Sequence, residues 1–383
     1  MTSEATRITE YTDTKNSLYL SFELGESEWK LGFTIGFGKK PRRRTIPARD
    51  VKKLQDEIEG AKQRFGLAKD APVMSCYEAG REGFWLHRYL SETGGENLVV
   101  DSSSIEVNRR ARRKKTDRLD VEKLLTMLIR YAYGERKVWS VVHVPSVEDE
   151  DRRQLHRELK TLKEEKVRTM NRIKGLLANQ GIRLKGELDL SEGKLDGIRL
   201  WNGLPLPAGL KARLAREWLL VQFLREQISV LECERRQLLR KDESKSAEQA
   251  RELSTLCGIG RNGSWILAHE FFGWRDFHNR RQVGALAGLC PTPYHSGDSL
   301  HEQGIGKDGN RHVRGLSVQL AWAWIRFQPK SKLTLWFQRR FSHSKGARKV
   351  GIVAVARKLL IDLWRFLERG VMPEGAQLKA EAK

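Results

Sequence analysis

The chain has few cysteines and no long apolar run. Its four cysteines, Cys76, Cys233, Cys257 and Cys290, are far apart, and none belongs to a CxxC pair or a Cys-His cluster. This spacing argues against a zinc site and predicts ordinary reduced thiols. No segment approaches the roughly 18 consecutive apolar residues of a membrane span, and the polar N-terminus lacks the apolar core of a signal peptide. We therefore expect a cytoplasmic protein with no membrane partner.

Acidic residues are outnumbered by basic ones along the whole chain. The 383 residues include 71 Lys and Arg against 49 Asp and Glu, a formal net charge of +22. This surplus points to a polyanionic partner, through phosphate contacts and counterion release. Charge alone leaves open a basic protein with no specific partner. Eleven tryptophans add possible stacking surfaces for unpaired bases, although helical spacing assigns most of them to the core.

The N-terminal part alternates short apolar runs with amphipathic stretches. We predict strands over Leu18–Leu24, Trp29–Phe37, Thr45–Ile46, Val73–Tyr77 and Asn97–Val100, and helices over Ala48–Phe65 and Phe84–Leu90. A further helix is predicted to start at Thr116, where the basic segment Arg109–Lys115 ends. The resulting order, β-β-β-α-β-α-β-α, is that of an RNase H-like α/β domain.

Acidic residues stand at the ends of two predicted strands and at the start of the last helix. Glu23 lies near the end of the first strand, and Glu78 directly follows Tyr77. Asp117 and Asp120 share one face of the helix because they are three residues apart. Carboxylates in such places can converge on one or two metal ions, which phosphodiester chemistry needs. A simpler explanation for Asp117 and Asp120 is that the helix dipole favours acidic residues in the first turn of a helix. A simpler explanation for Glu23 and Glu78 is that they are solvated charges at strand ends.

Four motifs follow one another in an informative order. They are CYEAGREGFWLHRYL (76–90), KKTDRLDVEKLL (114–125), GIG (258–260) and ALAGLCPTPYHSG (285–297). In this order they resemble the DEDD transposases of the one-ten family of bacterial insertion sequences, which are recombinases guided by a bridge RNA. The resemblance runs from about Leu18 to Leu367. It implies Mg²⁺ as cofactor, DNA and guide RNA as partners, and a homodimer that could form a tetramer on DNA.

The resemblance also implies which residues form the site. The family's four acids fall on Glu23, Glu78, Asp117 and Asp120, as catalytic residues and metal ligands, and its serine nucleophile falls on Ser296. The first acid of the family is usually Asp, so Glu23 departs from the pattern, although a longer carboxylate can still bind a metal. Without the resemblance, a local hydrogen bond would be the ordinary role of Ser296. Tyr294 and Ser299 are its local rivals as nucleophile.

The middle third is highly charged and has helical periodicity. Apolar residues recur at helical steps in a first arm, Leu155, Leu159, Leu162, Met170, Ile173 and Leu177, and at heptad positions in a second, Val221, Leu224, Ile228, Leu231 and Leu238. Arg235 occupies an intervening a position of the second arm. The two helices could form a dimerising coiled coil with basic faces for RNA, or a hairpin within one chain. The sequence prefers neither, and the resemblance favours dimerisation.

The C-terminal third contains turn and loop signals. Gly258-Ile259-Gly260 suits a helix-hairpin-helix turn or a simple turn. The segment Pro291–Pro293 predicts a rigid loop that exposes Ser296. Serine attacks phosphate only with help from a base, a metal or cations, and nearby in sequence are His295, Arg311, His312 and Arg314. We predict helices over Leu316–Phe327 and Val350–Leu367, and a disordered end over Glu374–Lys383.

These patterns together predict a protein of three parts. The expected domains are an RNase H-like catalytic domain (1–145), a helical coiled-coil dimerisation region (146–245) and a mainly α-helical transposase domain with Ser296 (246–383). The expected activity is DNA cleavage and rejoining through a covalent phosphoserine, with Mg²⁺ at the acids, on the bacterial nucleoid. One alternative is a RuvC-like metal-dependent nuclease that uses water. The other is a non-catalytic nucleic-acid-binding dimer.

Overall fold

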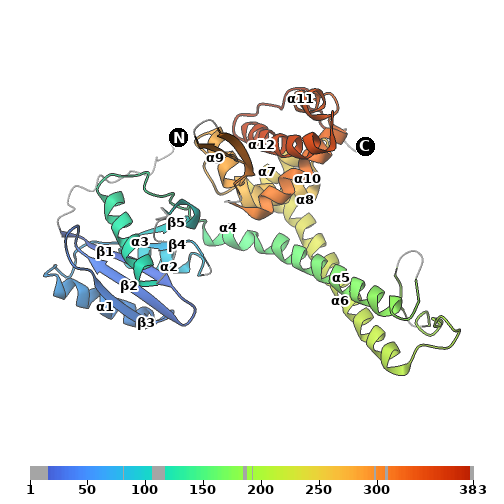
Figure 1. Cartoon of the computed structure of the whole chain (residues 1–383), viewed down its shortest axis with the longest axis horizontal. Coiled ribbons are helices and arrows are strands. Elements are labelled where there is room, and N and C mark those ends of the chain that lie inside the picture. Colours follow the sequence, from blue (N-terminus) through green and yellow to red (C-terminus); the bar gives the residue numbers. More distant parts are fainter. Residues whose placement is uncertain are drawn as a thin grey trace. The chain divides into compact units, whose positions relative to one another are not determined.

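Figure 1 shows the chain as a computed structural model, which describes residues 16–80, 82–105, 117–183, 188–191, 193–296, 299–306 and 309–379. Of residues 117–119, 292–296 and 299–303 only the backbone is described. Thr116 and Gly297 therefore lie outside the described residues. The chain separates into two compact units, Met1–Val144 and Pro145–Lys383, and the predicted division into three domains stays a prediction. None of the described helices is long and apolar enough to cross a membrane.

The first unit is built on a mixed sheet of five strands in the order β3-β2-β1-β4-β5. Its strands are β1 (Leu18–Leu24), β2 (Glu28–Thr34), β3 (Arg42–Pro47), β4 (Val73–Glu78) and β5 (Glu96–Val100). The strands β1, β4 and β5 are parallel, whereas β2 is antiparallel to β1 and to β3. This sheet, with its helices, confirms the predicted RNase H-like fold.

Helices cover both faces of this sheet (Figure 1). The side chains of α1 (Val51–Arg64) and α2 (Trp85–Glu92) pack with alternate strand residues in one buried cluster that includes Leu20, Phe22 and Tyr77. The other face packs against α3 (Asp117–Ala132), in a cluster that includes Tyr19, Met74 and Cys76. Two independent apolar layers therefore fix which strand residues face α3.

The strand boundaries differ from prediction by more than one residue in two places. The second strand ends at Thr34 rather than Phe37, because Gly36 takes a positive φ of 144°. The third strand is longer than predicted and includes Arg42, Arg43 and Arg44. Arginine runs are poor strand signals in a sequence, but here Arg42 and Arg44 pair with Glu57 at 2.5 and 3.2 Å.

A long antiparallel helical hairpin opens the second unit, after the short helix α4 (Val147–Arg152). It consists of α5 (Gln154–Ala178) and α6 (Ala208–Lys241), which appear as the two long helices in Figure 1. Leu159 and Ile173 of α5 and Val221 and Ile228 of α6 are among its buried residues. The two predicted arms thus pack on each other within one chain. Arg235 of the second arm is buried, and its guanidinium donates to Asn262 Oδ1 at 2.7 Å.

Over its described residues, the rest of the second unit is mostly helical and includes a two-stranded hairpin. Its elements are α7 (Lys245–Ser254), α8 (Arg261–Leu267), the π-helical turn η4 (Ala268–Phe272), α9 (Arg280–Leu286), β6 (Pro291–Ser296), β7 (Ser299–Ile305), α10 (Arg311–Phe327), α11 (Lys332–Phe341) and α12 (Lys345–Arg369). One core joins these helices around Trp324, Val355 and Leu359. The glycine turn at Gly258 has φ +84°, and a Cβ there would lie 3.2 Å from the Ala323 carbonyl oxygen, so close packing on α10 requires this glycine.

Two predictions for this domain are wrong. The proline segment is a strand and not a loop, because both strands of a two-stranded hairpin are edge strands, which tolerate proline. The chain end is not disordered over its described part. Gln377 donates its backbone N–H to Gln328 Oε1 at 2.8 Å, and Lys379 Nζ donates to the Ile259 carbonyl at 2.7 Å.

Candidate active site

Glu23 and Glu78 lie at the carboxyl ends of two neighbouring parallel strands. The register pairs Phe22 of β1 with Tyr77 of β4, so the two glutamates are the next residues of each strand in register. Neighbouring strands are about 4.8 Å apart in a sheet. Side chains alternate along each strand, so both glutamates follow the face that buries Tyr19 and Cys76 against α3. The sheet thus brings two of the predicted acids to one edge and one face.

The first turns of α3 cross the same face of the sheet. Ser21 Oγ donates to the Val121 carbonyl at 2.9 Å, which fixes α3 directly over β1. A Cβ on Gly32 would lie 2.5 Å from Val121 Cγ1, so the glycine permits this close approach. Asp120 directly precedes Val121, and Ser21 is two residues from Glu23 on the same face. Asp120 is therefore next in sequence to the residue through which α3 contacts β1.

The donor set suits a hard divalent cation such as Mg²⁺, because carboxylate oxygens are its preferred protein ligands. Glu23 and Asp120 are half-buried and Glu78 is exposed, so an ion could reach all three. Among residues with described side chains, no three acids, histidines or cysteines stand together as a ready metal group. The side chain of Asp117 lies outside this description. Glu23 is also the cross-strand neighbour of Lys30, which suits an ordinary paired carboxylate.

The loop after Glu78 contains a buried carboxylate, Glu82, whose ion pair with the half-exposed Arg49 the sequence did not reveal. Glu82 is 5% exposed and accepts from Arg49 Nη2 at 2.5 Å and Nε at 3.1 Å. Trp85 Nε1 donates to the same carboxylate at 3.3 Å. Arg49 has a positive φ of 67°, an uncommon backbone state for a residue other than glycine. These bonds tie Glu82 to the start of α2 and to the segment before α1.

Ser296 is the last residue of β6, at the closed end of the β6-β7 hairpin. It is paired with Ser299, whereas Pro291 is paired with Ile305 at the open end. Strand geometry places the Cα of Ser296 about 16 Å from that of Pro291. Arg311 and His312, two of the suggested helpers, begin α10 shortly after the open end. The hairpin thus carries Ser296 outward along the strands and away from its own base.

A buried carboxylate, Glu270, joins the starts of α5 and α10. It accepts from His156 Nε2 at 2.8 Å, from Arg157 Nε at 2.6 Å and from Asn310 Nδ2 at 3.3 Å. Burial would raise the pKa of the Glu270 carboxyl, but the hydrogen bonds and charges of His156 and Arg157 outweigh it and hold the pKa below its usual range. In the sequence, Glu270 is followed directly by two phenylalanines and belongs to no recognisable motif. The sequence therefore contains no local signal for its role.

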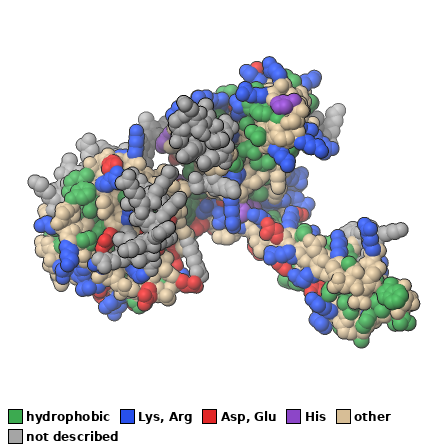
Figure 2. Space-filling view, in the orientation of Figure 1, with side chains coloured by type: hydrophobic (Ala, Val, Ile, Leu, Met, Phe, Trp, Pro, Cys, Tyr) green, Lys and Arg blue, Asp and Glu red, His purple; other side chains and the backbone are tan. Residues whose placement is uncertain are grey.

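His312 is held beside other cations. Lys160 Nζ donates to His312 Nδ1 at 3.0 Å. Burial lowers the pKa of His312, and the charges of Lys160 and Arg311 lower it further against the opposing charge of Glu270. Figure 2 shows Lys and Arg side chains over the visible face of both units. An RNase H-like sheet with acids at its strand ends and a cationic helical unit together define the class of a nucleic-acid-processing enzyme.

Sequence comparison identifies the family. Residues 250–335 match the family described as Transposase IS116/IS110/IS902. The chain is 40% identical over 378 residues to y4rJ of Sinorhizobium fredii, which carries a transposase name, and the match covers 95% of each chain. It is 25% identical to the transposase for insertion sequence element IS1328 of Yersinia enterocolitica, over 80% of this chain and 87% of the relative. It is also 25% identical to that for IS1111A of Coxiella burnetii, over 85% and 84%.

The chain therefore belongs to the IS116/IS110/IS902 family of transposases. This confirms the resemblance seen in the four sequence motifs. The protein is accordingly an enzyme of insertion-sequence transposition and DNA recombination, and DNA is its substrate. The matched segment 250–335 includes the hairpin with Ser296 and the start of α10.

Proposed function

We propose that the protein cleaves and rejoins DNA through Ser296, in a reaction that also uses Glu23, Glu78, Asp117 and Asp120. The parallel register of β1 and β4, which sets Glu23 beside Glu78 on the face under α3, is the observation that supports this proposal most. The four acids belong to the first compact unit and Ser296 to the second. The reaction therefore needs both units, from one chain or from two.

The covalent step is a balanced exchange at phosphorus. Ser296 Oγ forms a bond to the phosphorus of the DNA backbone while the bond from phosphorus to a deoxyribose oxygen breaks. The serine loses its proton, and the departing oxygen gains one. Because the phosphoserine keeps the energy of the broken phosphodiester, attack by a deoxyribose hydroxyl can rejoin the strand without a nucleotide cofactor. Cations near the phosphate would stabilise the negative charge of the transition state.

The four acids, Glu23, Glu78, Asp117 and Asp120, would bind Mg²⁺. When bound, the metal supplies Lewis-acid stabilisation of charge on the phosphate oxygens. The carboxylates themselves would hold this cation at the sheet edge. A guide RNA then selects the DNA sites by base pairing, as the family resemblance implies, and the cationic surface provides sequence-independent phosphate contacts. The protein would act on the nucleoid in the bacterial cytoplasm.

A covalent-adduct assay tests the proposal. The full chain is co-expressed with the flanking non-coding DNA and a donor-target pair, and protein-DNA adducts are resolved on a denaturing gel. We expect an adduct in wild type that disappears in Ser296→Ala and in Asp117→Ala, whereas Ser299→Ala, the matched hydroxyl control across the hairpin, retains it. Cleavage that persists in Ser296→Ala without an adduct would support the water-using nuclease. Binding without cleavage in wild type would support a non-catalytic dimer.

We also propose that the outer face of α6 forms a homodimer. Leu219, Phe223 and Val230 are 64%, 55% and 54% exposed and form one stripe on the side opposite α5. An antiparallel pair of α6 helices centred near residue 224 would set Leu219 of one chain against Val230 of the other. The same register sets the exposed Arg216 near the exposed Glu234 of the second chain. This self-complementary pattern of apolar and charged residues favours a second copy as the occupant.

Sedimentation of charge-matched variants tests the dimer. Leu219→Glu places a charge within the apolar stripe of the proposed interface, so we expect the dimer of wild type to dissociate into monomers. Leu335→Glu is the control, because Leu335 is a similarly exposed leucine (48%) on α11. Equal sedimentation of wild type and Leu219→Glu at every concentration would show that this face does not join two copies.

A further inference from the structure

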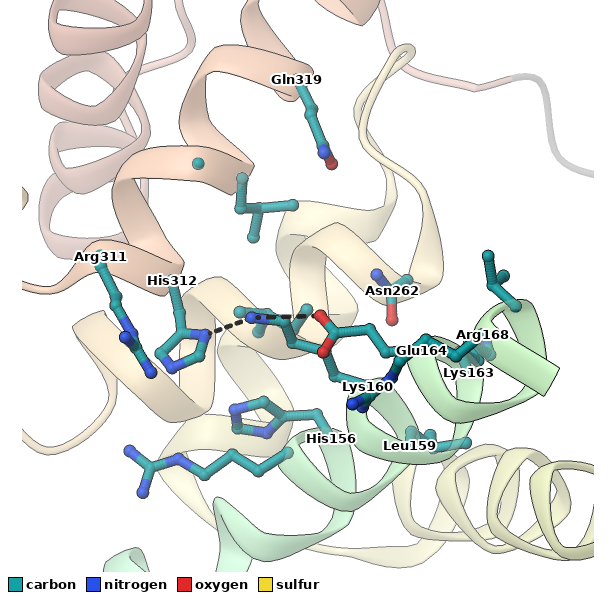
Figure 3. A pocket seen from close by; sticks show the side chains of 15 residues that line it. His156, Leu159, Lys160, Lys163, Glu164, Arg168, Asn262, Arg311, His312 and Gln319 are labelled. Carbon is teal, nitrogen blue, oxygen red and sulfur yellow. Dashed lines mark hydrogen bonds and ion pairs between the residues drawn. The ribbon is translucent and has the colours of Figure 1, made fainter. Parts of the chain in front are cut away.

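A cationic pocket lies between α5, α8 and α10 in the second unit. Its volume is about 730 Å³, which is within the usual range for sites of small organic ligands. Figure 3 shows Arg311 and His312 of α10 on one side of the pocket, with Lys160, Glu164 and Arg168 of α5 on another. The pocket is thus walled by segments that are distant in sequence.

The charge around this pocket favours an anion. Five lining side chains are cationic, Arg157, Lys160, Lys163, Arg168 and Arg311, against one carboxylate, Glu164. Arg157 is committed to Glu270, and Lys163 pairs with Glu232 at 2.5 Å. Arg168 pairs with Glu165 at 3.2 Å, whereas Lys160 lies 3.8 Å from Glu164, a longer contact that a phosphate can replace. Lys160 and Arg311 therefore supply most of the charge available to a ligand, and together they lower the pKa of His312. A phosphate group would relieve this crowding of positive charge.

The pocket also has apolar walls and polar groups that suit more than a phosphate. Leu159, Ile266 and Leu316 line it, and so do the amides of Asn262 and Gln319. His156 lines it as well and is 6% exposed. Its Nε2 is bound to Glu270, whereas its buried Nδ1 has no hydrogen-bond partner among the described residues. Apolar walls beside amides and cations match the base, sugar and phosphate of one nucleotide.

We infer that this pocket holds one unpaired nucleotide of an RNA strand. Its phosphate would contact Lys160 and Arg311, and its base would lie against Leu159, Ile266 and Leu316. A single nucleotide matches the pocket volume, which is too small for a double helix. The inference rests on the proposed RNA partner and adds the place where a nucleotide of that RNA binds.

The observations favour RNA over DNA as the source of this nucleotide. Structured RNA presents unpaired nucleotides in loops and bulges, and proteins usually read RNA sequence there. Duplex DNA must first unstack and unpair the base, which costs a few kcal/mol. The 2′-hydroxyl of RNA also adds a donor and acceptor for the amides that line the pocket.

Gly315 allows a steric test that leaves the charge unchanged. It lines the pocket within α10, and a Cβ built on it meets no other atom within 4 Å. Gly315→Leu would therefore fill pocket space while improving helix propensity. Gly175→Leu is the matched control, because Gly175 is a helical glycine of α5 that also has open space and does not line the pocket.

The assay is fluorescence anisotropy with the full chain and a short 5′-phosphorylated oligouridylate. We expect about tenfold weaker binding for Gly315→Leu and for Lys160→Ala with Arg311→Ala, the latter with a salt slope reduced by about two. Gly175→Leu and the exposed pair Lys345→Ala with Lys349→Ala should stay within about twofold of wild type. Equal binding by Gly315→Leu and Gly175→Leu would overturn the inference, as would tighter binding of the matching oligodeoxyuridylate.

A second arm separates this inference from the proposed function. Binding of the RNA transcribed from the flanking non-coding DNA is measured with the same variants. If wild type binds this RNA and the pocket variants bind it and the oligouridylate equally well, the pocket inference fails and RNA guidance stands. If wild type binds oligouridylate through Gly315 but does not bind the flanking RNA, RNA guidance fails and the pocket stands.

Discussion

Glu270 is the buried charge on which the starts of α5 and α10 converge, and its removal should destabilise the second unit. The residue is fully buried and receives hydrogen bonds from His156, Arg157 and Asn310. Glu270→Gln preserves the size of the side chain but removes its charge. It also directs an amide N–H₂ toward neighbours that are themselves donors.

The expected loss follows from these contacts. A hydrogen bond to a charged group contributes about 1.5–3 kcal/mol, and breaking a buried pair costs about 3–5 kcal/mol. The side chain of Arg157 is 41% exposed, so it can recover some hydration when its partner is lost. The lower end of the range for a broken buried pair therefore applies. We expect a loss of about 3 kcal/mol, which corresponds to a decrease in melting temperature of roughly 6–12 °C for a unit of this size.

Thermal unfolding followed by circular dichroism provides the measurement. Glu232→Gln is the control, because Glu232 also bonds a cation, Lys163 at 2.5 Å, but is 40% exposed and should contribute less than about 1 kcal/mol. The depressed pKa of Glu270 means that its contribution is complete above about pH 4.3 and declines as the pH falls further. Equal melting temperatures for the two variants near neutral pH would refute this account of the network.

Two further predictions concern a buried histidine and a helix-sheet contact. Burial lowers the pKa of His269 to about 4 although the ring is hydrogen-bonded to the Trp265 carbonyl. The free energy of unfolding should therefore decrease as the pH falls from about 6.5 to about 4, because the unfolded protein binds a proton at this histidine and the folded protein does not. His269→Phe keeps a ring on Trp265 and should remove up to about 3 kcal/mol of this pH dependence in urea unfolding; an unchanged dependence would contradict the assignment. Gly32→Ala should cost about 1–3 kcal/mol by pushing Val121 and α3 off the sheet, and Val121→Ala should restore the double variant. If calorimetry finds no such rescue, the clash lies elsewhere.

Local patterns predicted the first strand, Leu18–Leu24, to the residue, because its apolar run ends at a clear turn. They also found the start of the late helix with Asp117. They missed the strand at Arg42–Arg44, since arginines carry no strand signal without their carboxylate partners. They misread Pro291–Pro293 as a loop, because edge-strand status depends on the number of strands in the sheet.

The sequence by itself determined the RNase H-like class, the family and the residue types of the site, because periodicity and ordered motifs are local properties of the chain. The tertiary structure alone decided that Glu23 and Glu78 are in register, that Glu270 binds His156 and Arg157, and which segments wall the pocket. The residues of these contacts are far apart in the chain. Such long-range pairs leave no periodic trace in the sequence, and they form only when the packing of helices and strands fixes their positions.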